Sequence, residues 1–154
     1  MKTIPLINSD QVTLVDDNDY EEVSKHRWRL RLNGYVQSSS KIGGKQPYLA
    51  RFVLNTPKGL ETDHKNNDPL DNRRENLRIA TRSQNAANIS KRRGALTSRF
   101  KGVIWYKGAK KWRAQIKSNN KQNYLGLFKS EEKAAHAYDV AATKYFGEFA
   151  RVNF

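Results

Sequence analysis

Three short runs in the last third of the chain limit the fold more than any other feature of the sequence. Residues 111–117 (KWRAQIK) alternate between apolar and polar side chains, which is the period of a half-buried β-strand. Strand-like runs at 101–106 and 122–128 flank this segment, and turn-forming residues separate the three runs. The pattern therefore predicts a three-stranded antiparallel sheet.

A capped helix is predicted directly after these strands. Ser130 suits the N-cap, Glu131 and Glu132 place negative charge in the first turn, and Gly147 ends the helix. Alanines recur along it, so it can pack closely against one face of the sheet. The other face carries basic and aromatic side chains and is free to enter the major groove of DNA. The alternative is an ordinary α+β domain whose polar face is solvated.

The charge balance points to a polyanionic partner. Among 154 residues, 29 are Lys or Arg and 15 are Asp or Glu, which gives a formal charge of +14. A balance this basic is typical of nucleic-acid-binding proteins, although a merely soluble basic protein is the plainer alternative. Only 37% of the residues are hydrophobic, so two small cores are easier to fill than one large core. The absence of Cys excludes disulfides and Cys-ligated zinc.

The first third of the chain predicts short strands and carries no recognisable chemistry. The Asn33-Gly34 pair is a strong hairpin signal between strand-like residues 28–32 and 35–38. No apolar run approaches the length of a membrane span, and the first five residues do not resemble a signal peptide. We expect a protein that contacts no membrane.

The residues that can carry chemistry lie between Glu61 and Asn85. The adjacent Asp63 and His64 precede a loop rich in Asn and Asp, and Asn76 and Asn85 follow it. This set combines a hard oxygen ligand for a divalent cation, a group that titrates near neutrality and several amides. Metal-assisted phosphodiester hydrolysis requires these groups. Each residue alone is more simply explained by a structural role, but their combination favours a nuclease site.

The residues around this set predict a strand, a long loop, a second strand and a helix, which is a ββα unit. The strand carries Asp63 and His64, and the helix carries Asn85. We expect an α+β chain with a β-rich segment plus this unit at 1–90. A basic linker that touches the DNA backbone follows at 91–99, and a second domain occupies 100–154.

Residues 61–88 resemble the HNH homing endonucleases of phages and introns, in the version in which asparagine replaces the final histidine. The matching text is D-H-K-N-N-D-P-L-D-N-R-R-E-N-L-R-I-A-T-R-S-Q-N. The resemblance implies that His64 is the general base and that Asp63 and Asn85 hold one Mg²⁺ or Mn²⁺. It also implies that Asn76 bonds across the loop and orients His64. Arg73, Arg74 and Arg78 are expected to contact phosphate. Ala50 departs from the family, because relatives often carry histidine there.

Residues 100–154 resemble the plant ethylene-response-factor DNA-binding domain, which also occurs fused to HNH endonucleases. The runs K-G-V-I-W-Y, W-R-A-Q-I, Y-L-G-L-F and E-E-K-A-A-H-A-Y-D-V-A-A carry the match. In that family the three-stranded sheet enters the major groove. Carried onto this sequence, the resemblance implies DNA contacts by Lys101, Ile104, Tyr106, Arg113, Gln115, Lys117, Gln122 and Tyr124. Several of these positions are arginine in the plant domains, so a plant-type target is not expected.

The two resemblances together imply a site-directed DNA endonuclease that uses one divalent metal ion and leaves a 5′ phosphate. Its partner would be double-stranded DNA rather than a small-molecule substrate, and we expect a monomer in the cytoplasm, or in the host cytoplasm if a phage encodes it. One alternative is a catalytically inactive DNA-binding regulator. Another is an RNA-binding protein whose exposed aromatic side chains stack on bases.

Overall fold

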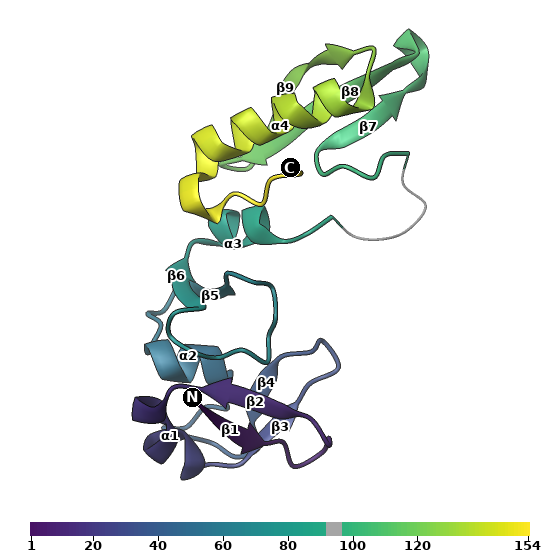
Figure 1. The fold of residues 1–154 in the computed structure, drawn as a ribbon. Helices are drawn as coiled ribbons and strands as arrows, with labels where there is room; N and C mark the ends of the chain where they lie inside the picture. Colours follow the sequence, from purple (N-terminus) through teal and green to yellow (C-terminus); the bar gives the residue numbers. More distant parts are fainter. Residues whose placement is uncertain (92–96) are drawn as a thin grey trace. The chain divides into compact units, whose positions relative to one another are not determined.

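The computed structural model describes residues 1–91 and 97–154, which divide into two compact units, 1–81 and 82–154 (Figure 1). The predicted basic linker at 91–99 lies partly outside the described residues, because 92–96 belong to it. Within the described part of the chain, none of the helices has the length and apolar character needed to cross a membrane.

The first unit begins with two antiparallel ribbons and two short helices. Each of the two ribbons is built from neighbouring strands of the chain, and the helices follow the second and fourth strands. The elements are β1 (Lys2–Pro5), β2 (Val12–Val15), α1 (Asp17–Ser24), β3 (Trp28–Leu30), β4 (Val36–Ser38) and α2 (Leu49–Leu54). The predicted β-rich character of this segment is therefore present, with the helices added.

The core of the first unit gathers around Trp28, whose side chain is fully buried. Its indole Nε1 donates a hydrogen bond of 2.9 Å to the Val23 carbonyl, so the polar atom of this large side chain is satisfied inside the core. Leu49 from α2 and Val15 from β2 are also fully buried in the same cluster. Residues from both ribbons and both helices thus share one small core.

The β3–β4 hairpin has a longer turn than the Asn33-Gly34 pair predicts. The strands pair Leu30 with Val36, and residues 31–35 connect them. The Gly34 N–H donates to the Arg31 carbonyl at 2.9 Å, and Gly34 has a φ of +85°. Glycine adopts this left-handed conformation without a steric cost, and the arrangement matches a three-residue hairpin loop closed by a bulge.

A third ribbon completes the first unit. Strands β5 (Glu61–His64) and β6 (Leu77–Ala80) pair so that Asp63 lies opposite Arg78 and His64 lies opposite Leu77. The long polar loop 65–76 connects them. Helix α3 (Arg82–Asn88) follows in sequence but belongs to the second unit. The predicted strand, loop, strand and helix are all present along the chain.

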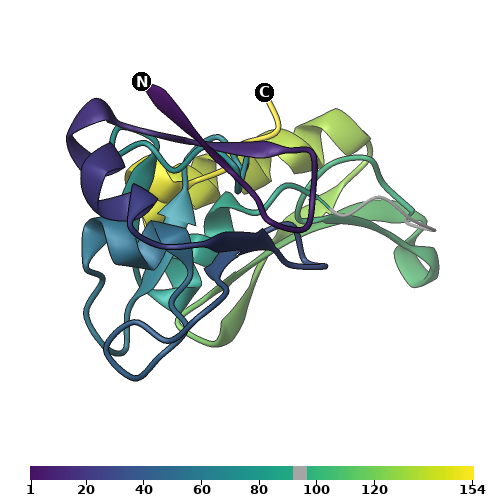
Figure 2. The same cartoon turned by 90° about the horizontal axis from the view of Figure 1, so that it is seen from below.

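The second unit contains the predicted three-stranded antiparallel sheet packed on a helix. Strands β7 (Val103–Tyr106), β8 (Lys111–Ser118) and β9 (Lys121–Phe128) pair in sequence order. Helix α4 (Glu131–Phe146) lies along one face of this sheet (Figures 1 and 2). Short 3₁₀ turns, Lys107–Ala109 and Gly147–Phe149, follow β7 and α4.

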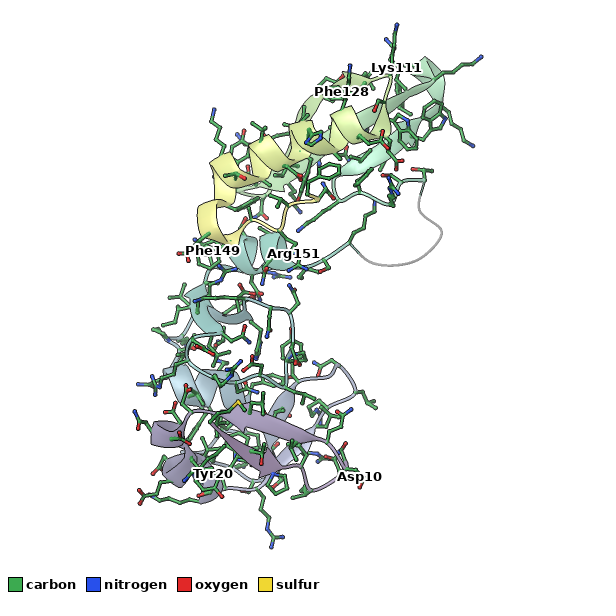
Figure 3. The ribbon with its side chains drawn as sticks, viewed as in Figure 1. Asp10, Tyr20, Lys111, Phe128, Phe149 and Arg151 are labelled. Carbon is green, nitrogen blue, oxygen red and sulfur yellow. The ribbon has the colours of Figure 1, made fainter. Side chains whose placement is uncertain are left out.

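Small residues allow α4 to approach the sheet closely. Ala134 and Ala135 are fully buried against the strands, as the alanine-rich pattern predicts. The Ser130 hydroxyl accepts a hydrogen bond from the Lys133 N–H, which confirms the predicted cap. A side chain at Gly102 would collide with the Tyr138 ring at 1.9 Å, so glycine is required where β7 begins. In Figure 3, Lys111 and Phe128 lie at one end of this unit, and Phe149 and Arg151 lie at the other.

The register of β8 and β9 shifts once. Ala114 pairs with Gly126, but the next residue, Gln115, pairs with Tyr124, so Leu125 is an extra residue in β9. This is a β-bulge, which changes the face to which the following side chains point. Leu125 consequently packs into both hydrophobic clusters beneath the sheet.

Candidate functional site

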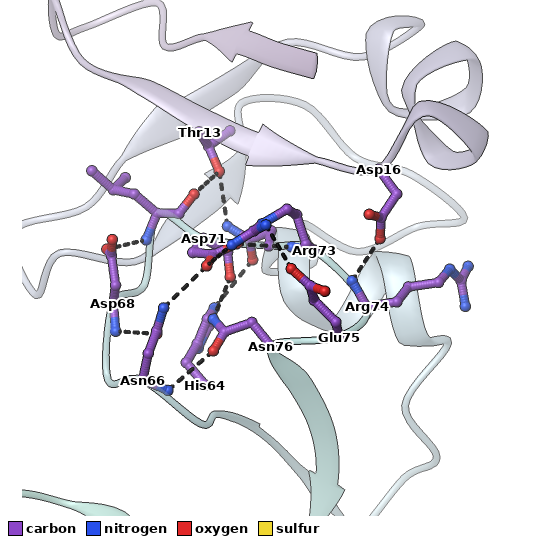
Figure 4. Close-up of polar contacts among 12 residues, drawn as sticks. Thr13, Asp16, His64, Asn66, Asp68, Asp71, Arg73, Arg74, Glu75 and Asn76 are labelled. Carbon is purple, nitrogen blue, oxygen red and sulfur yellow. Dashed lines mark hydrogen bonds and ion pairs between the residues drawn. The ribbon is translucent and has the colours of Figure 1, made fainter. Parts of the chain in front are cut away.

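The loop between β5 and β6 is held by a dense set of hydrogen bonds (Figure 4). The Asn76 side chain crosses the loop: its Oδ1 accepts from the Asn66 N–H at 3.0 Å, and its Nδ2 donates to the Asp71 carbonyl at 2.7 Å. The Lys65 N–H also donates to the Asn76 carbonyl at 2.9 Å. Asn76 is buried, so these bonds form away from competing water. The sequence-based expectation that Asn76 bonds across the loop agrees with this geometry.

Short side chains also turn the loop back on itself. Asn66 Oδ1 accepts from the Asp68 N–H at 2.8 Å, and Asp68 Oδ1 accepts from the Leu70 N–H at 2.9 Å. Such local bonds are the reason that Asn and Asp favour turns over helices and strands. The high polarity of residues 65–73 thus produces an ordered loop rather than a loose one.

The N-terminal ribbon anchors this loop. Thr13 Oγ1 donates to the Leu70 carbonyl at 2.7 Å, and the Leu14 N–H donates to the same carbonyl at 2.8 Å. The Leu14 carbonyl in turn accepts from the Asn72 N–H at 2.9 Å. Strand β2 therefore supports the part of the loop that faces His64. This gives the first segment of the chain a function that its sequence did not reveal.

His64 is buried and its ring is held by Asn72. His64 Nε2 lies 3.2 Å from Asn72 Oδ1. Asn72 Nδ2 donates to Thr13 Oγ1 at 2.8 Å and to the Pro69 carbonyl at 3.0 Å. Because a carbonyl can only accept, the amide nitrogen must face Pro69, and the amide oxygen must face the imidazole. The neutral ring therefore carries its proton on Nε2, and Nδ1 holds the lone pair.

Burial is the main influence on the charge of His64. It lowers the pKa of the imidazole, because the charged form loses solvation. The Asn72 hydrogen bond and the carboxylates Asp63, Asp68 and Asp71 act in the opposite direction. The ring also contacts Tyr35, whose centroid lies 5.8 Å from that of His64. The lowered pKa favours the neutral imidazole, which is the form that a general base requires.

Asp63 forms a buried ion pair. Its Oδ2 lies 2.7 Å from Arg78 Nε, and both side chains are almost fully buried. The pairing follows from the β5–β6 register, which places the two residues opposite each other. The Arg78 bond holds the Asp63 carboxylate in one orientation on β5. Within residues 1–91 and 97–154, three or more His, Asp or Glu side chains do not gather as a metal cluster.

Asn85 lies on α3 and thus in the second unit, whereas Asp63, His64 and Asn76 lie in the first. The structure therefore brings three of the four predicted nuclease residues together on β5, β6 and their loop. The convergence of Asn85 with Asp63 on one cation stays a prediction.

The three arginines expected to contact phosphate each bind a carboxylate in this structure. Arg73 makes two bonds of 2.8 Å to Asp71, and Arg74 makes bonds of 2.8 and 2.7 Å to Asp19. The Asp71 bond lowers the pKa of that carboxyl and raises that of Arg73. Together with Arg78, these cations stabilise the loop. Their contact with phosphate stays a prediction that these ion pairs do not favour.

The sheet of the second unit brings most of the predicted DNA-contacting residues onto one face. The strand register pairs Ile104 with Arg113, Gln115 with Tyr124 and Lys117 with Gln122. Residues at paired positions point to the same face of a sheet. Tyr106 joins them, because the Arg113 guanidinium lies 5.7 Å from the centre of its ring. The opposite face, with Ala114 and Ile116, is buried against α4.

Lys101 is placed differently from these residues. Its Nζ donates to the Ala87 carbonyl and, at 2.7 Å, to the Ile89 carbonyl, so it closes the end of α3. Burial, together with the nearby charge of Arg151, lowers its pKa to about 8. Its main chain is also fixed, since the Lys101 N–H donates to Asn153 Oδ1 at 2.7 Å. The DNA contact predicted for Lys101 stays a prediction, and this geometry does not favour it.

Two residues near His64 were not singled out from the sequence. Asn72 binds the imidazole, and Tyr35 packs against it from a hairpin that precedes the loop by about 30 residues. Asn72 lies in a run of Asn and Asp residues, and nothing in the sequence distinguishes it from the others as the partner of His64. No pattern in the sequence points to Tyr35.

Comparison with known proteins finds two families along the chain, and the first match extends across the boundary between the two units. Residues 55–87 match the family model described as HNH endonuclease, and residues 98–148 match that of the AP2 domain. An uncharacterized HNH endonuclease of Acanthamoeba polyphaga mimivirus is 32% identical over 137 residues, covering 85% of this chain and 68% of the relative. The chain therefore belongs to the HNH endonuclease family, and it carries an AP2 domain after the HNH motif.

Plant proteins are also among the relatives. The AP2-like ethylene-responsive transcription factor PLT2 of Arabidopsis thaliana is 31% identical over 161 residues, covering 88% of this chain but 28% of the relative. The ethylene-responsive transcription factor WRI1 of the same plant is 45% identical over 58 residues, covering 38% of this chain and 13% of the relative. The chain thus spans about a quarter or less of these plant factors.

Proposed function

We propose that this chain is a DNA endonuclease that hydrolyses a phosphodiester bond with His64 as general base and leaves a 5′ phosphate. The observation that carries the proposal is the His64 ring itself, which is buried, neutral and fixed by Asn72 through Nε2. Nδ1 then accepts a proton from the attacking water as its oxygen bonds to phosphorus. The bond from phosphorus to the 3′ oxygen breaks in the same displacement.

Asn72 has a positioning role in this scheme. By accepting the Nε2 proton it fixes the tautomer, and it supports the imidazolium once Nδ1 has taken a proton. Thr13 and the Pro69 carbonyl fix the amide in turn. Asn76 acts one step further away, because it holds the loop that presents Asn72. This chain of contacts supports a preorganised base.

The donor set fits one divalent cation, Mg²⁺ or Mn²⁺, held by Asp63 with Asn85. Carboxylate and amide oxygens are the ligands that hard cations prefer, and the Arg78 bond orients the carboxylate from behind. A cation bound there would supply positive charge that stabilises the departing 3′ oxygen. In this proposal α3 joins β5 and β6 as the third part of a ββα unit, with nuclease residues at 1–90 and DNA-reading residues at 100–154.

The sheet of the AP2 domain would select the place of cutting. Its outer face presents Arg113, Gln115 and Gln122, and these side-chain types bind guanine and adenine edges in the major groove. Lys117 would contact phosphate, while Ile104, Tyr106 and Tyr124 supply apolar contact. This face is not rich in arginine. Its target sequence should therefore differ from the sequences that arginine-rich faces bind. The partner is double-stranded DNA, bound by one copy of the chain.

The experiment is incubation of the purified full chain with long duplex DNA of varied sequence, with Mg²⁺ or Mn²⁺. We expect nicks that carry a 5′ phosphate, and loss of nicking without loss of binding in His64→Ala. His26→Gln is the matched control, because His26 packs on Trp28 and Phe52 away from the loop. An absence of nicks with both cations across all substrates would contradict the proposal.

One observation favours a second candidate, a DNA-binding regulator without nuclease activity. The Asp63 carboxylate is buried and already neutralised by Arg78, which reduces the attraction of the site for a cation. A regulator would bind duplex DNA through the sheet and show no nicks. Binding of Mn²⁺ by the full chain separates the two, since the nuclease requires it and the regulator does not.

A further inference from the structure

The turn between β3 and β4 is a closed and braced structure. The Arg31 N–H donates to the Tyr35 carbonyl at 2.9 Å, and the Tyr35 N–H donates to Asn33 Oδ1 at 3.3 Å. At its base, the Asn8 side chain bonds both polar groups of the Leu30 main chain, at 2.8 and 2.9 Å. These bonds fix the turn before any partner arrives.

Leu32 stands at the tip of this turn with its side chain wholly in solvent. Its relative exposure is 111%, and no other large apolar side chain in the described residues reaches this value; the next is Val140 at 72%. Single exposed apolar residues are common on protein surfaces. A leucine held at the tip of a braced turn, however, is in the best position to enter a partner, because ordering it costs little further entropy.

The turn lies directly beside His64. Tyr35, at its end, packs against the imidazole with ring centroids 5.8 Å apart. Gly34 faces the loop that holds the imidazole, since a side chain there would lie 3.5 Å from Pro69 Cγ. A ligand at His64 would therefore also meet the turn.

The charge around the tip suits a polyanion. Arg31 precedes Leu32 in the turn and Arg29 lies in β3, and neither forms an ion pair with a carboxylate among the residues that the structure describes. Arg29 Nε is buried without a hydrogen-bond partner. In contrast, Arg73 and Arg74 on the neighbouring loop and Arg78 on β6 are all paired. Arg31, which is exposed in the turn, is thus available to phosphate.

We propose that the 31–35 turn is a wedge that inserts Leu32 into the minor groove of duplex DNA and unstacks one base step beside the bond served by His64. The inference rests on the proposed function for its partner. Apolar wedges of this size, flanked by cations, open base steps and kink DNA by about 20–90°. A kink here would turn the adjacent phosphate toward the His64 ring, while Arg31 contacts the backbone next to it.

The test uses the full chain carrying His64→Ala, without divalent metal, and a duplex recovered by selecting bound molecules from a random pool. Donor and acceptor dyes at the duplex ends report bending, and 2-aminopurine placed at successive positions reports unstacking. With Leu32 present, we expect the duplex to bend and the 2-aminopurine fluorescence to rise at one position. Leu32→Ala should abolish both signals. Binding should weaken about tenfold, as for loss of one buried leucine contact.

Ile7→Ala is the matched control, because Ile7 is an exposed apolar residue of the same unit at 56% exposure. It should keep the bend and the bright position. Equal melting temperatures for both variants would exclude misfolding. Bending and unstacking that persist in Leu32→Ala would overturn the wedge, even for a chain that cuts DNA. A wedge signal in a chain that never cuts would support the wedge and contradict the nuclease.

Discussion

The loop around His64 and the outer face of the three-stranded sheet treat polar side chains in opposite ways. In the loop, charged and amide groups bind one another: Arg73 pairs with Asp71, Arg78 with Asp63, and Asn72 with His64. On the sheet face, neither Arg113 nor Lys117 forms an ion pair within the described residues. The difference teaches that the loop satisfies its polar groups internally, whereas the sheet face leaves cationic side chains open to a partner, which is DNA under the proposed function.

The largest test of this contrast is the removal of one partner from the loop. Arg78→Met leaves the buried Asp63 carboxylate without its cation, which should lower the stability of the first unit by about 3–5 kcal/mol. Urea-dependent hydrogen exchange of residues 61–80 measures this loss. Arg74→Met is the control, because the Arg74 side chain is 55% exposed and such pairs contribute about 1 kcal/mol or less. Equal losses would show that the loop is not held by its buried charges.

Asn72→Ala tests whether the loop is arranged for catalysis rather than for stability alone. Without the amide oxygen the Nε2 proton has lost its partner, so cutting should fall about 10- to 100-fold while DNA binding remains. Thr13→Val removes the Thr13–Asn72 bond but leaves the bond to His64. It should keep most of the cutting rate. Equal cutting rates for Asn72→Ala and Thr13→Val would mean that Asn72 has only a structural role.

The sheet face should respond through DNA binding alone. Arg113→Ala should weaken binding to the preferred sequence by about 1–3 kcal/mol and relax selection at one position. Lys117→Gln should weaken binding to all sequences alike and reduce the salt slope by about one unit. Titrations at several salt concentrations separate these effects. A change in the stability of the sheet would show that these side chains make stabilising contacts within the protein, which would contradict the contrast with the loop.

The smallest effect is expected at Lys101, a half-buried cation of the second unit. Its pKa in the folded chain is about 8, below its ordinary value of 10.5, so the unfolded chain binds more protons between these values. The free energy of unfolding should therefore rise from pH 8 to 10.5 by a contribution that Lys101→Met lacks. Urea titrations of both proteins at the two ends of this range measure it. Parallel pH dependence would contradict the burial of this amine.

The sequence predicts the second unit well because its signals are local. The alternation at 111–117 gave β8, and Ser130 gave the start of α4, since both depend on neighbours in the chain. The strand predicted from residue 101 begins instead at Val103, because Lys101 is tied to Asn153 and Gly102 is pressed against Tyr138. These are tertiary contacts that no local pattern contains.

The candidate site was predictable in its residues but not in its arrangement. Asp63, His64 and Asn76 stand out as residue types, and their strand and loop positions follow from polarity. The support from Thr13 to Asn72 joins residues 59 positions apart, and it depends on a ribbon whose sequence shows no sign of function. The ion pairs of Arg73, Arg74 and Arg78 were equally unpredictable. The sequence does not distinguish an arginine that binds phosphate from one that pairs with a carboxylate such as Asp71.

The extra residue Leu125 has a consequence for how such a protein can change. Because the bulge resets the alternation of β9, the half that carries Gln122 and Tyr124 is out of phase with the half that carries Phe128. Deleting Leu125 would restore simple alternation and keep Gln122 and Tyr124 on the outer face, but it would remove a leucine that packs against both clusters beneath the sheet. Point substitutions can alter Gln122 and Tyr124 without touching the packing below. Substitutions in the polar half of β9 therefore leave the core intact, whereas shortening the strand at the bulge removes core packing.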